Sequence, residues 1–201
     1  MNKGDYEIRL IRETDVEEVL AIYAPYVEHT HISFEYDVPT LEEYLGRIRT
    51  NTKDYPWLVC LFNGKIIGYA YAGKHRYRTA YQWSPESTIY LAPGAHRKGI
   101  GRILYQTLFD MLQLQGHFNV YAGVGLPNEK SIGFHKALGF YEIGVFKNVG
   151  YKLGEWHDTH WFQLHLAEHI HQPPAPLLLA DVTERSDFKT LLESANRKVN
   201  N

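Results

Sequence analysis

Short runs of alternating or wholly apolar residues predict β-strands along much of the chain. These runs occupy residues 7–10, 57–62, 66–71, 87–91, 118–124, about 141–146 and 159–166. Asn63-Gly64 lies between the second and third runs, and both residue types tolerate the positive φ angles of a two-residue hairpin turn. The pattern therefore predicts an antiparallel hairpin at this point.

Helices are predicted where apolar residues return every three to four positions. Thr14-Asp15-Val16-Glu17 and Thr40-Leu41-Glu42-Glu43 both have the spacing of a capping box, so we expect each to open a helix. A longer amphipathic helix follows Gly101. A short helix from 128 to 138 would end at Gly139, which is a typical C-terminal cap.

The order of these elements predicts an α/β fold in which helices flank a mixed, strongly twisted central sheet. We expect residues 1–171 to form this domain. The chain then changes character, because Gln172-Pro173-Pro174-Ala175-Pro176 is stiff and a polar helical stretch follows. Residues 172–201 would form a C-terminal extension that packs on the domain or on a partner, or stays partly disordered.

Composition narrows the function classes. Apolar residues make up 44% of the 201 residues and the formal net charge is −2, which is ordinary for a globular protein and disfavours nucleic acid as a partner. No apolar run approaches the roughly 20 residues of a membrane-spanning helix, and we find no secretory signal segment. Cys60 is the single cysteine, so an internal disulfide is impossible and a cytoplasmic protein is expected.

The loop His96-Arg97-Lys98-Gly99-Ile100-Gly101 joins a predicted strand to a predicted helix. Its glycines allow close backbone approach, and the free N–H groups of the helix start, together with Arg97, Lys98 and Arg102, suit a pyrophosphate. Leu104 stands where the dinucleotide fingerprint has its third glycine, and no Gly-Lys-Ser/Thr ending marks a nucleoside-triphosphate loop. The alternative is a basic glycine turn that only ends a strand.

Arg97-Lys98-Gly99-Ile100-Gly101 before an amphipathic helix resembles the coenzyme A loop of GCN5-related N-acetyltransferases (GNAT). The resemblance implies that the preceding strand separates from its neighbour and offers backbone N–H groups of Ile89, Tyr90 and Leu91 to a thioester. A carboxylate at the start of that strand would lie near the incoming amine, so Glu86 is the candidate general base, directly or through a water. The alternative is a solvated glutamate at a strand end.

Cations alternate at Lys74, Arg76 and Arg78, and they would share one face if this segment is extended. Arginine binds carboxylate and phosphinate oxygens through two parallel hydrogen bonds, and a tyrosine hydroxyl can add a neutral donor. The run therefore predicts a small substrate that has anionic groups as well as an amine. The alternative is a solvated basic loop.

Collinear blocks across residues 6–166 resemble the phosphinothricin N-acetyltransferase family. They are Pro56-Trp57-Leu58-Val59, Ala70-Tyr71-Ala72-Gly73, Glu86-Ser87-Thr88-Ile89-Tyr90, Gly125-Leu126-Pro127-Asn128, Leu138-Gly139-Phe140, Gly150-Tyr151-Lys152 and Trp156-His157-Asp158. The resemblance implies a homodimer that acetylates the α-amine of a glutamate-like phosphinic acid with acetyl-CoA, which gives herbicide resistance. It also implies substrate contacts at Phe34, Arg76, Arg78, Tyr81 and Thr88, pyrophosphate contacts at Arg97, Lys98, Gly99, Ile100, Gly101 and Arg102, pantetheine neighbours at Asn128 and Ser131, and Glu86 as the base.

Two positions depart from the wider pattern. His135 stands where many GNAT members have a tyrosine that protonates the thiolate, and histidine can act as the acid, bind the cofactor or orient a neighbour. Glu35 follows Phe34 where the family tends to carry a basic residue, so an extra negative charge near the pocket could change substrate choice. The five histidines between 157 and 171 match no zinc spacing, and we expect no metal.

Three other functions stay open at this stage. Acetylation of methionine sulfoximine or methionine sulfone would use the same chemistry and the same arginines. A non-catalytic acyl-CoA-binding module would keep the loop but could lose Glu86 and the cationic run, and this chain has both. A protein acetyltransferase would favour an open acidic groove, whereas Arg76 and Arg78 repel a basic peptide.

Overall fold

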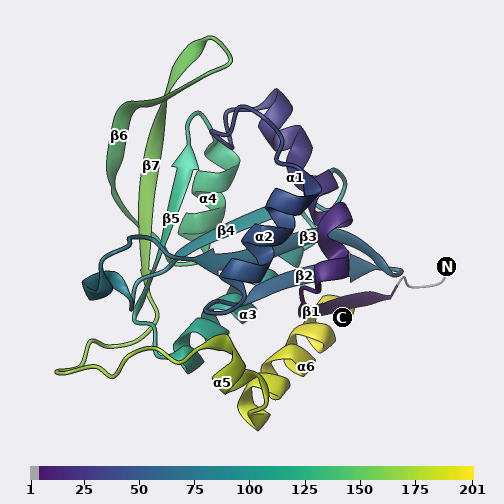
Figure 1. Cartoon of the computed structure of the whole chain (residues 1–201), viewed down its shortest axis with the longest axis vertical. Coiled ribbons are helices and arrows are strands. Elements are labelled where there is room, and N and C mark those ends of the chain that lie inside the picture. Colours follow the sequence, from purple (N-terminus) through teal and green to yellow (C-terminus); the bar gives the residue numbers. More distant parts are fainter. Residues whose placement is uncertain (1–4) are drawn as a thin grey trace.

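The computed structural model describes residues 5–201, which form a seven-stranded sheet with the order β1-β2-β3-β4-β5-β7-β6 (Figure 1). The strands are β1 (Tyr6–Leu10), β2 (Trp57–Phe62), β3 (Lys65–Gly73), β4 (Glu86–Leu91), β5 (Asn119–Gly125), β6 (Tyr141–Lys152) and β7 (Glu155–His165). Strands β4 and β5 run parallel, whereas the other neighbouring pairs in the described residues are antiparallel. The predicted mixed α/β sheet is therefore confirmed.

Helices cover both faces of the sheet. α1 (Val16–His29) and α2 (Leu41–Asn51) lie on one face, and α3 (Ile100–Gln115) lies on the other (Figure 1). Because side chains alternate along a strand, Val59 and Tyr69 join the core beneath α1 and α2, while Cys60 and Ala70 join the core beneath α3. The remaining helices are the short turns η1 (Glu13–Asp15) and η2 (Thr79–Tyr81), then α4 (Glu129–Ala137), α5 (Leu179–Thr183) and α6 (Ser186–Asn200).

One of the two predicted capping boxes forms. The Thr40 backbone N–H donates to Glu43 Oε2 at 2.8 Å, and the Glu43 N–H donates to Thr40 Oγ1 at 3.3 Å. The expected helix forms from Val16, but the capping box at Thr14 is wrong, because η1 precedes α1 and the N-cap residue Asp15 makes no side-chain hydrogen bond to the first turn of α1. The Asp15 carboxylate accepts from the Arg12 N–H at 2.7 Å and from the Arg9 guanidinium at 2.6 Å, which keeps the carboxylate at this helix start.

Both hairpins turn through residues with positive φ. Asn63 (50°) and Gly64 (80°) join β2 to β3 as predicted, and Leu153 (54°) and Gly154 (85°) join β6 to β7. The second hairpin is longer than the runs at 141–146 and 159–166 indicated, because the strands continue through half-polar sequence to Lys152 and from Glu155. The end of this hairpin projects beyond the rest of the sheet (Figure 1).

The C-terminal extension packs on the domain. Helix α6 contacts α3 and β1, and the side chains of Val182 and Phe188 are fully buried in the core beneath α3 (Figure 1). Asn196 and Asn200 hydrogen-bond to the outer edge of β1. Among residues 5–201, no helix has the length and apolar character that a bilayer crossing requires.

Candidate active site

Glu86 is the first residue of β4, at the point where the sheet opens. The parallel strand β5 pairs with β4 at a single register position, Glu86 opposite Tyr121. The two strands diverge beyond this pair. The edge of β4 that faces β5 therefore has no strand partner at Ile89 and Leu91. The backbone groups of Tyr90 point the other way, because Ala92 donates to the Ile67 carbonyl oxygen and hydrogen-bonded pairs alternate, which bonds Tyr90 to Tyr69 of β3.

His75 lies against Glu86 and is the residue that the sequence analysis missed at this point. Its Nδ1 is 3.3 Å from Glu86 Oε2, and its ring stacks on Tyr121 with centroids 4.8 Å apart. Its side chain is 12% exposed, whereas that of Glu86 is 35% exposed. The imidazole therefore fixes one carboxylate oxygen and leaves the group open to a substrate. Strand pairing could have indicated this contact, because Gly73 is the register partner of Glu86 and His75 follows Gly73 by two residues.

Glu86 and Thr88 point to the sheet face that α1 and α2 cover. Tyr71 is the register partner of Thr88, so the two side chains are neighbours on that face. Burial raises the pKa of Tyr71, the carboxylates of Glu86 and Glu35 raise it further, and the hydroxyl of Thr88 and the charge of Arg47 oppose the shift. Three charged groups are thus within electrostatic reach of one partly buried hydroxyl.

Glu35 is paired inside the protein. Arg47 of α2 donates from Nη1 to Oε1 at 2.5 Å and from Nη2 to Oε2 at 2.9 Å, and the Tyr23 hydroxyl donates to Oε1 at 2.9 Å. Burial disfavours the ionised carboxylate, but these hydrogen bonds outweigh it, and the pKa of Glu35 lies below its ordinary value. The extra negative charge expected from the sequence is therefore compensated by a cation that the sequence analysis did not identify.

Phe34 lies in a loop that is fastened to the end of the β6–β7 hairpin. A Cβ on Gly150 would lie 2.6 Å from the Phe34 ring, so the ring packs directly on the glycine backbone. The Tyr36 hydroxyl donates to the carbonyl oxygen of Tyr151. The aromatic expected in the substrate pocket is thus held by the Gly150-Tyr151-Lys152 block.

Lys152 completes this attachment, and the sequence analysis gave it no role. Its side chain is 3% exposed, and Nζ donates to the carbonyl oxygens of Val27 at 2.5 Å and Ser33 at 2.7 Å. Burial lowers the pKa of Lys152, while the charge of Glu35 opposes the shift. The lysine joins the end of β6 to the end of α1 and to the loop that carries Phe34.

The start of α3 has the geometry expected of an anion-binding loop. Arg97 (φ 62°) and Gly99 (φ 78°) both adopt left-handed backbone conformations, and Gly99 is the residue before the helix. Ile100 is buried, and a Cβ on Gly101 would approach the Phe134 ring of α4 to 3.3 Å. The exposed cations beside these N–H groups are Arg97, Lys98 and Arg102. Open N–H groups, a loop position without Cβ and nearby cations fit the pyrophosphate of coenzyme A.

Three of the predicted site residues, Asn128, Ser131 and His135, hydrogen-bond to one another at helix α4. Asn128 Oδ1 accepts from the Ser131 N–H at 3.1 Å and caps the helix. His135 is 3% exposed, and its Nδ1 lies 2.8 Å from the Ser131 carbonyl oxygen. A carbonyl can only accept, so Nδ1 carries the proton and Nε2 of the neutral ring has a lone pair. Burial lowers the pKa of His135 against the effect of this hydrogen bond, which disfavours the imidazolium that an acid would need.

Arg76, Arg78 and Tyr81 do not share an extended face. Strand β3 ends at Gly73, and η2 curls residues 79–81 into a helical turn, so the strand alternation assumed for the cations is lost. Arg76 and Arg78 are exposed, and neither side chain makes a hydrogen bond or ion pair within residues 5–201. Tyr81 is 43% exposed. The loop leads into β4, whose first residue is Glu86.

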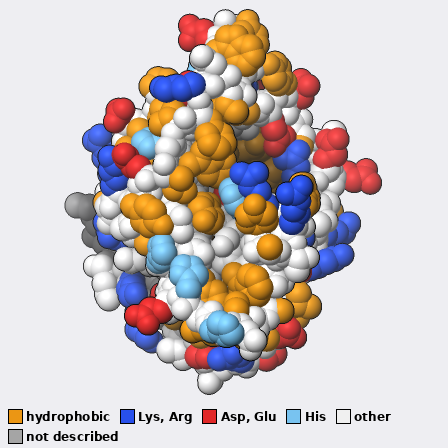
Figure 2. Space-filling view, turned by 90° about the vertical axis from the view of Figure 1, so that its left-hand side faces the viewer, with side chains coloured by type: hydrophobic (Ala, Val, Ile, Leu, Met, Phe, Trp, Pro, Cys, Tyr) orange, Lys and Arg blue, Asp and Glu red, His pale blue; other side chains and the backbone are white. Residues whose placement is uncertain are grey.

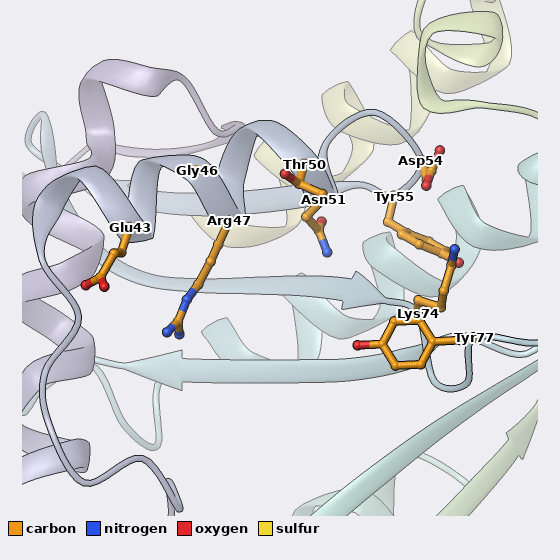
Figure 3. A pocket seen from close by; sticks show the side chains of 9 residues that line it. All are labelled: Glu43, Gly46, Arg47, Thr50, Asn51, Asp54, Tyr55, Lys74 and Tyr77. Carbon is orange, nitrogen blue, oxygen red and sulfur yellow. The ribbon is translucent and has the colours of Figure 1, made fainter.

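Two grooves lie on the part of the surface that the structure describes, and neither is lined by Glu86 or by the other site residues predicted from the sequence. The first, of about 670 Å³, lies between α2 and the loop after β3, with Arg47 and Asn51 extending from the helix and Lys74 and Tyr77 opposite (Figure 3). The second, of about 650 Å³, lies between α4 and the β6–β7 hairpin. On the side of the molecule where the β6–β7 hairpin lies, Lys and Arg side chains border a hollow (Figure 2). The described residues contain no group of three or more His, Cys, Asp or Glu side chains suited to a metal.

Known proteins resemble this chain in sequence and in fold. Residues 8–161 match the acetyltransferase (GNAT) domain family. The chain is 36% identical to the phosphinothricin N-acetyltransferase of Streptomyces viridochromogenes over 171 residues, which are 85% of this chain and 92% of that protein. It is 36% identical over 115 residues to the L-methionine sulfoximine/L-methionine sulfone acetyltransferase of Salmonella typhimurium, which are 57% and 67% of the two chains.

A solved structure supports the same relationship. The crystal structure of a GNAT superfamily phosphinothricin acetyltransferase from Sinorhizobium meliloti in complex with AcCoA matches with a TM-score of 0.81 and 35% identity, over 84% of this chain and 93% of that one. The family model, the sequence relatives and the solved structure all indicate the same family. The chain therefore belongs to the GNAT acetyltransferase family.

Proposed function

We propose that the protein transfers an acetyl group from acetyl-CoA to the α-amine of L-phosphinothricin or a similar glutamate-like amino acid. The observation that supports this most is the carboxylate of Glu86 at the point where β4 and β5 diverge. The relative from Streptomyces viridochromogenes supports the substrate class, and the AcCoA complex from Sinorhizobium meliloti supports the acetyl donor.

In the proposed mechanism, Glu86 takes a proton from the substrate ammonium, directly or through a water, and the free amine attacks the thioester carbonyl. His75 keeps the carboxylate oriented through its 3.3 Å contact. Backbone N–H groups on the open edge of β4, those of Ile89 and Leu91, stabilise the negative charge that develops on the carbonyl oxygen, whereas the Tyr90 N–H points to β3. The tetrahedral adduct then collapses: the C–S bond breaks, the thiolate leaves, and the nitrogen gives up its second proton to water, so that a neutral amide forms.

Water returns the proton to the thiolate in this proposal. His135 is the other candidate acid, but its Nδ1 proton is committed to the Ser131 carbonyl oxygen and burial disfavours a second proton. Its Nε2 is buried and makes no hydrogen bond within residues 5–201. His135 would thus orient its neighbours in α4 rather than supply the proton.

The proposed binding residues fall into two groups, one for the acetyl donor and one for the amino acid. The proposed contacts to the acetyl donor are Arg97, Lys98, Gly99, Ile100, Gly101 and Arg102 at the pyrophosphate, with Asn128 and Ser131 beside the pantetheine. The proposed contacts to the amino acid are Phe34, Arg76, Arg78, Tyr81 and Thr88. The exposed Arg76 and Arg78 would close on the anionic groups of the substrate as it binds.

We also propose a homodimer in the cytoplasm. The hairpin β6–β7 ends the sheet and exposes large apolar side chains, which gather along one face (Figure 2). They include Ile143, Phe146, Val149, Tyr151, Leu153 and Trp156, each about half or more exposed. An exposed apolar patch of this kind is typical of a protein–protein interface. Light scattering after gel filtration measures the oligomeric state of the protein. The cytoplasmic location is supported by the single cysteine, Cys60, which excludes an internal disulfide and fits a reducing compartment.

Thiol release from acetyl-CoA tests the proposed activity. L-phosphinothricin, L-methionine sulfoximine, L-methionine sulfone and L-glutamate are offered separately to the purified protein. Selective turnover of the phosphinic acid supports the first assignment, and selective turnover of the sulfoximine or sulfone supports the alternative that the Salmonella relative suggests. If acetyl-CoA binds but all four compounds are inert, the substrate assignment is wrong.

A further inference from the structure

The Glu35–Arg47 ion pair has no part in the mechanism above, yet it faces the substrate side of the sheet. Its two hydrogen bonds, of 2.5 and 2.9 Å, use two guanidinium N–H groups in the fork geometry that arginine offers to carboxylates and phosphinates. The side chains remain 35% and 46% exposed. A ligand can therefore reach the guanidinium, but Glu35 occupies the N–H groups that an anionic ligand would use.

Three observations put this pair beside the reacting groups. Glu35 directly follows Phe34, which packs on the hairpin end at Gly150. Arg47 extends from α2 toward the strands and lines the groove that Lys74 also borders (Figure 3). Helix α2 covers the sheet face on which the Glu86 side chain lies, and the charges of Arg47, Glu35 and Glu86 all act on the hydroxyl of the intervening Tyr71.

We propose that Glu35 sets the charge preference of the amino-acid pocket by occupying Arg47. With the pair intact, the field of the guanidinium is compensated, so the pocket gives little advantage to a negatively charged head group over a neutral polar one. Without the carboxylate, Arg47 becomes a free anion receptor. This inference rests on the proposed function and identifies which residue decides between its two substrate classes.

The test compares L-phosphinothricin, whose phosphinate is anionic at neutral pH, with L-methionine sulfone, whose head is neutral. The measured quantity is the ratio of kcat/KM for the two substrates, together with the ratio of their dissociation constants from calorimetry. A unit charge about 6 Å from an anionic head, at an effective dielectric constant of about 20, changes binding roughly a hundredfold, and salt screening reduces this. We expect Glu35→Gln to raise the preference for phosphinothricin by about tenfold or more.

Further variants separate charge from structure. Glu35→Asp keeps the charge and should hold the ratio within about threefold. Arg47→Gln leaves the carboxylate uncompensated and should lower the preference for phosphinothricin, whereas the double variant with Glu35→Gln should return it toward the wild-type value. The matched control is Glu13→Gln, which breaks the exposed 2.6 Å pair with Arg49 on the same helix and should leave the ratio unchanged.

A structural disturbance affects both substrates equally, so an unchanged ratio in Glu35→Gln overturns the inference even if activity falls. A rise in the ratio with Glu13→Gln also overturns it, because the effect would then be a general one of surface charge. If the wild-type protein acetylates neither of these two compounds, nor L-methionine sulfoximine, nor L-glutamate, the proposed function is wrong. The ratio of dissociation constants then still decides the charge preference, and failure of both compounds to bind any variant counts against it.

Discussion

The C-terminal helix α6 gives the sharpest stability prediction, because two of its side chains hydrogen-bond to backbone groups at the free edge of the sheet. Asn196 Oδ1 accepts from the Ile8 N–H at 2.7 Å and its Nδ2 donates to the Ile8 carbonyl oxygen at 2.8 Å. Asn200 makes the same two bonds with Tyr6, at 3.0 and 2.8 Å. Four residues of helix advance about 6.0 Å and two residues of strand about 6.6 Å, so the two amides meet alternate peptide groups in register.

The magnitude follows from these four bonds. At about 1 kcal/mol net each they stabilise the fold by about 4 kcal/mol. Alanine is a better helix former than asparagine by about 0.5 kcal/mol per site, which offsets part of the loss. The double variant Asn196→Ala/Asn200→Ala should therefore lower the free energy of unfolding by about 3 kcal/mol.

Urea denaturation followed by circular dichroism measures this difference at fixed protein concentration. Glu193→Ala on the exposed side of α6 is the control and should change the free energy of unfolding by less than about 0.5 kcal/mol. A loss below about 1 kcal/mol in the double variant would refute the reasoning, because it would mean that water replaces the two amides at no cost. The variant should also aggregate more readily, since it leaves the β1 edge unpaired.

Three further predictions concern the site and the core. Glu86→Gln should lower kcat by about 100-fold or more while the dissociation constant of acetyl-CoA, from calorimetry, stays within about twofold; unchanged turnover removes Glu86 from the mechanism. Burial lowers the pKa of His117 from its ordinary value of 6.5 to about 4, so the unfolded state binds a proton more readily than the folded state. The free energy of unfolding is therefore highest above about pH 6.5 and decreases as the pH falls toward 4. Between pH 7 and 5 this loss is about 2 kcal/mol, and denaturation of His117→Phe should show a correspondingly smaller decline. Gly150→Ala pushes the Phe34 ring and should raise KM for the amino acid about tenfold without affecting KM for acetyl-CoA; equal effects on both contradict the assigned pocket.

Local chemistry explains which elements the sequence could predict. Asn63-Gly64 and Thr40–Glu43 determine their own turn and cap, because the interacting groups are at most three residues apart. The strand pattern and the glycine loop likewise follow from neighbouring residues, and they led to the correct sheet. The failure at Thr14 has the opposite cause. A carboxylate one position later is fixed by Arg9 of a separate strand, and no local rule contains that partner.

The sequence alone could indicate only those residues of the candidate site that lie on β4 or in the loop before α3. Glu86 and the glycines are recognisable from position. The partners that orient them are distant in sequence, as Lys152 shows by donating to Val27 and Ser33 more than a hundred residues away. Arg47 is similar, because nothing in α2 itself indicates that its side chain meets Glu35 across the pocket.

Strand β4 explains how one short segment can serve two substrates. Its side chains alternate, so Glu86 and Thr88 face α1 and α2, where the amino acid is proposed to bind, while Ile89 faces α3 and lies 3.5 Å from the position of a Cβ on Gly101. The backbone edge between these faces is open toward β5. Side chains on the first face can therefore change without disturbing the helix start that suits the pyrophosphate. In the proposed arrangement, selectivity for the amine and affinity for the acetyl donor are therefore separable, and the Glu35–Arg47 pair lies on the face proposed to bind the amino acid.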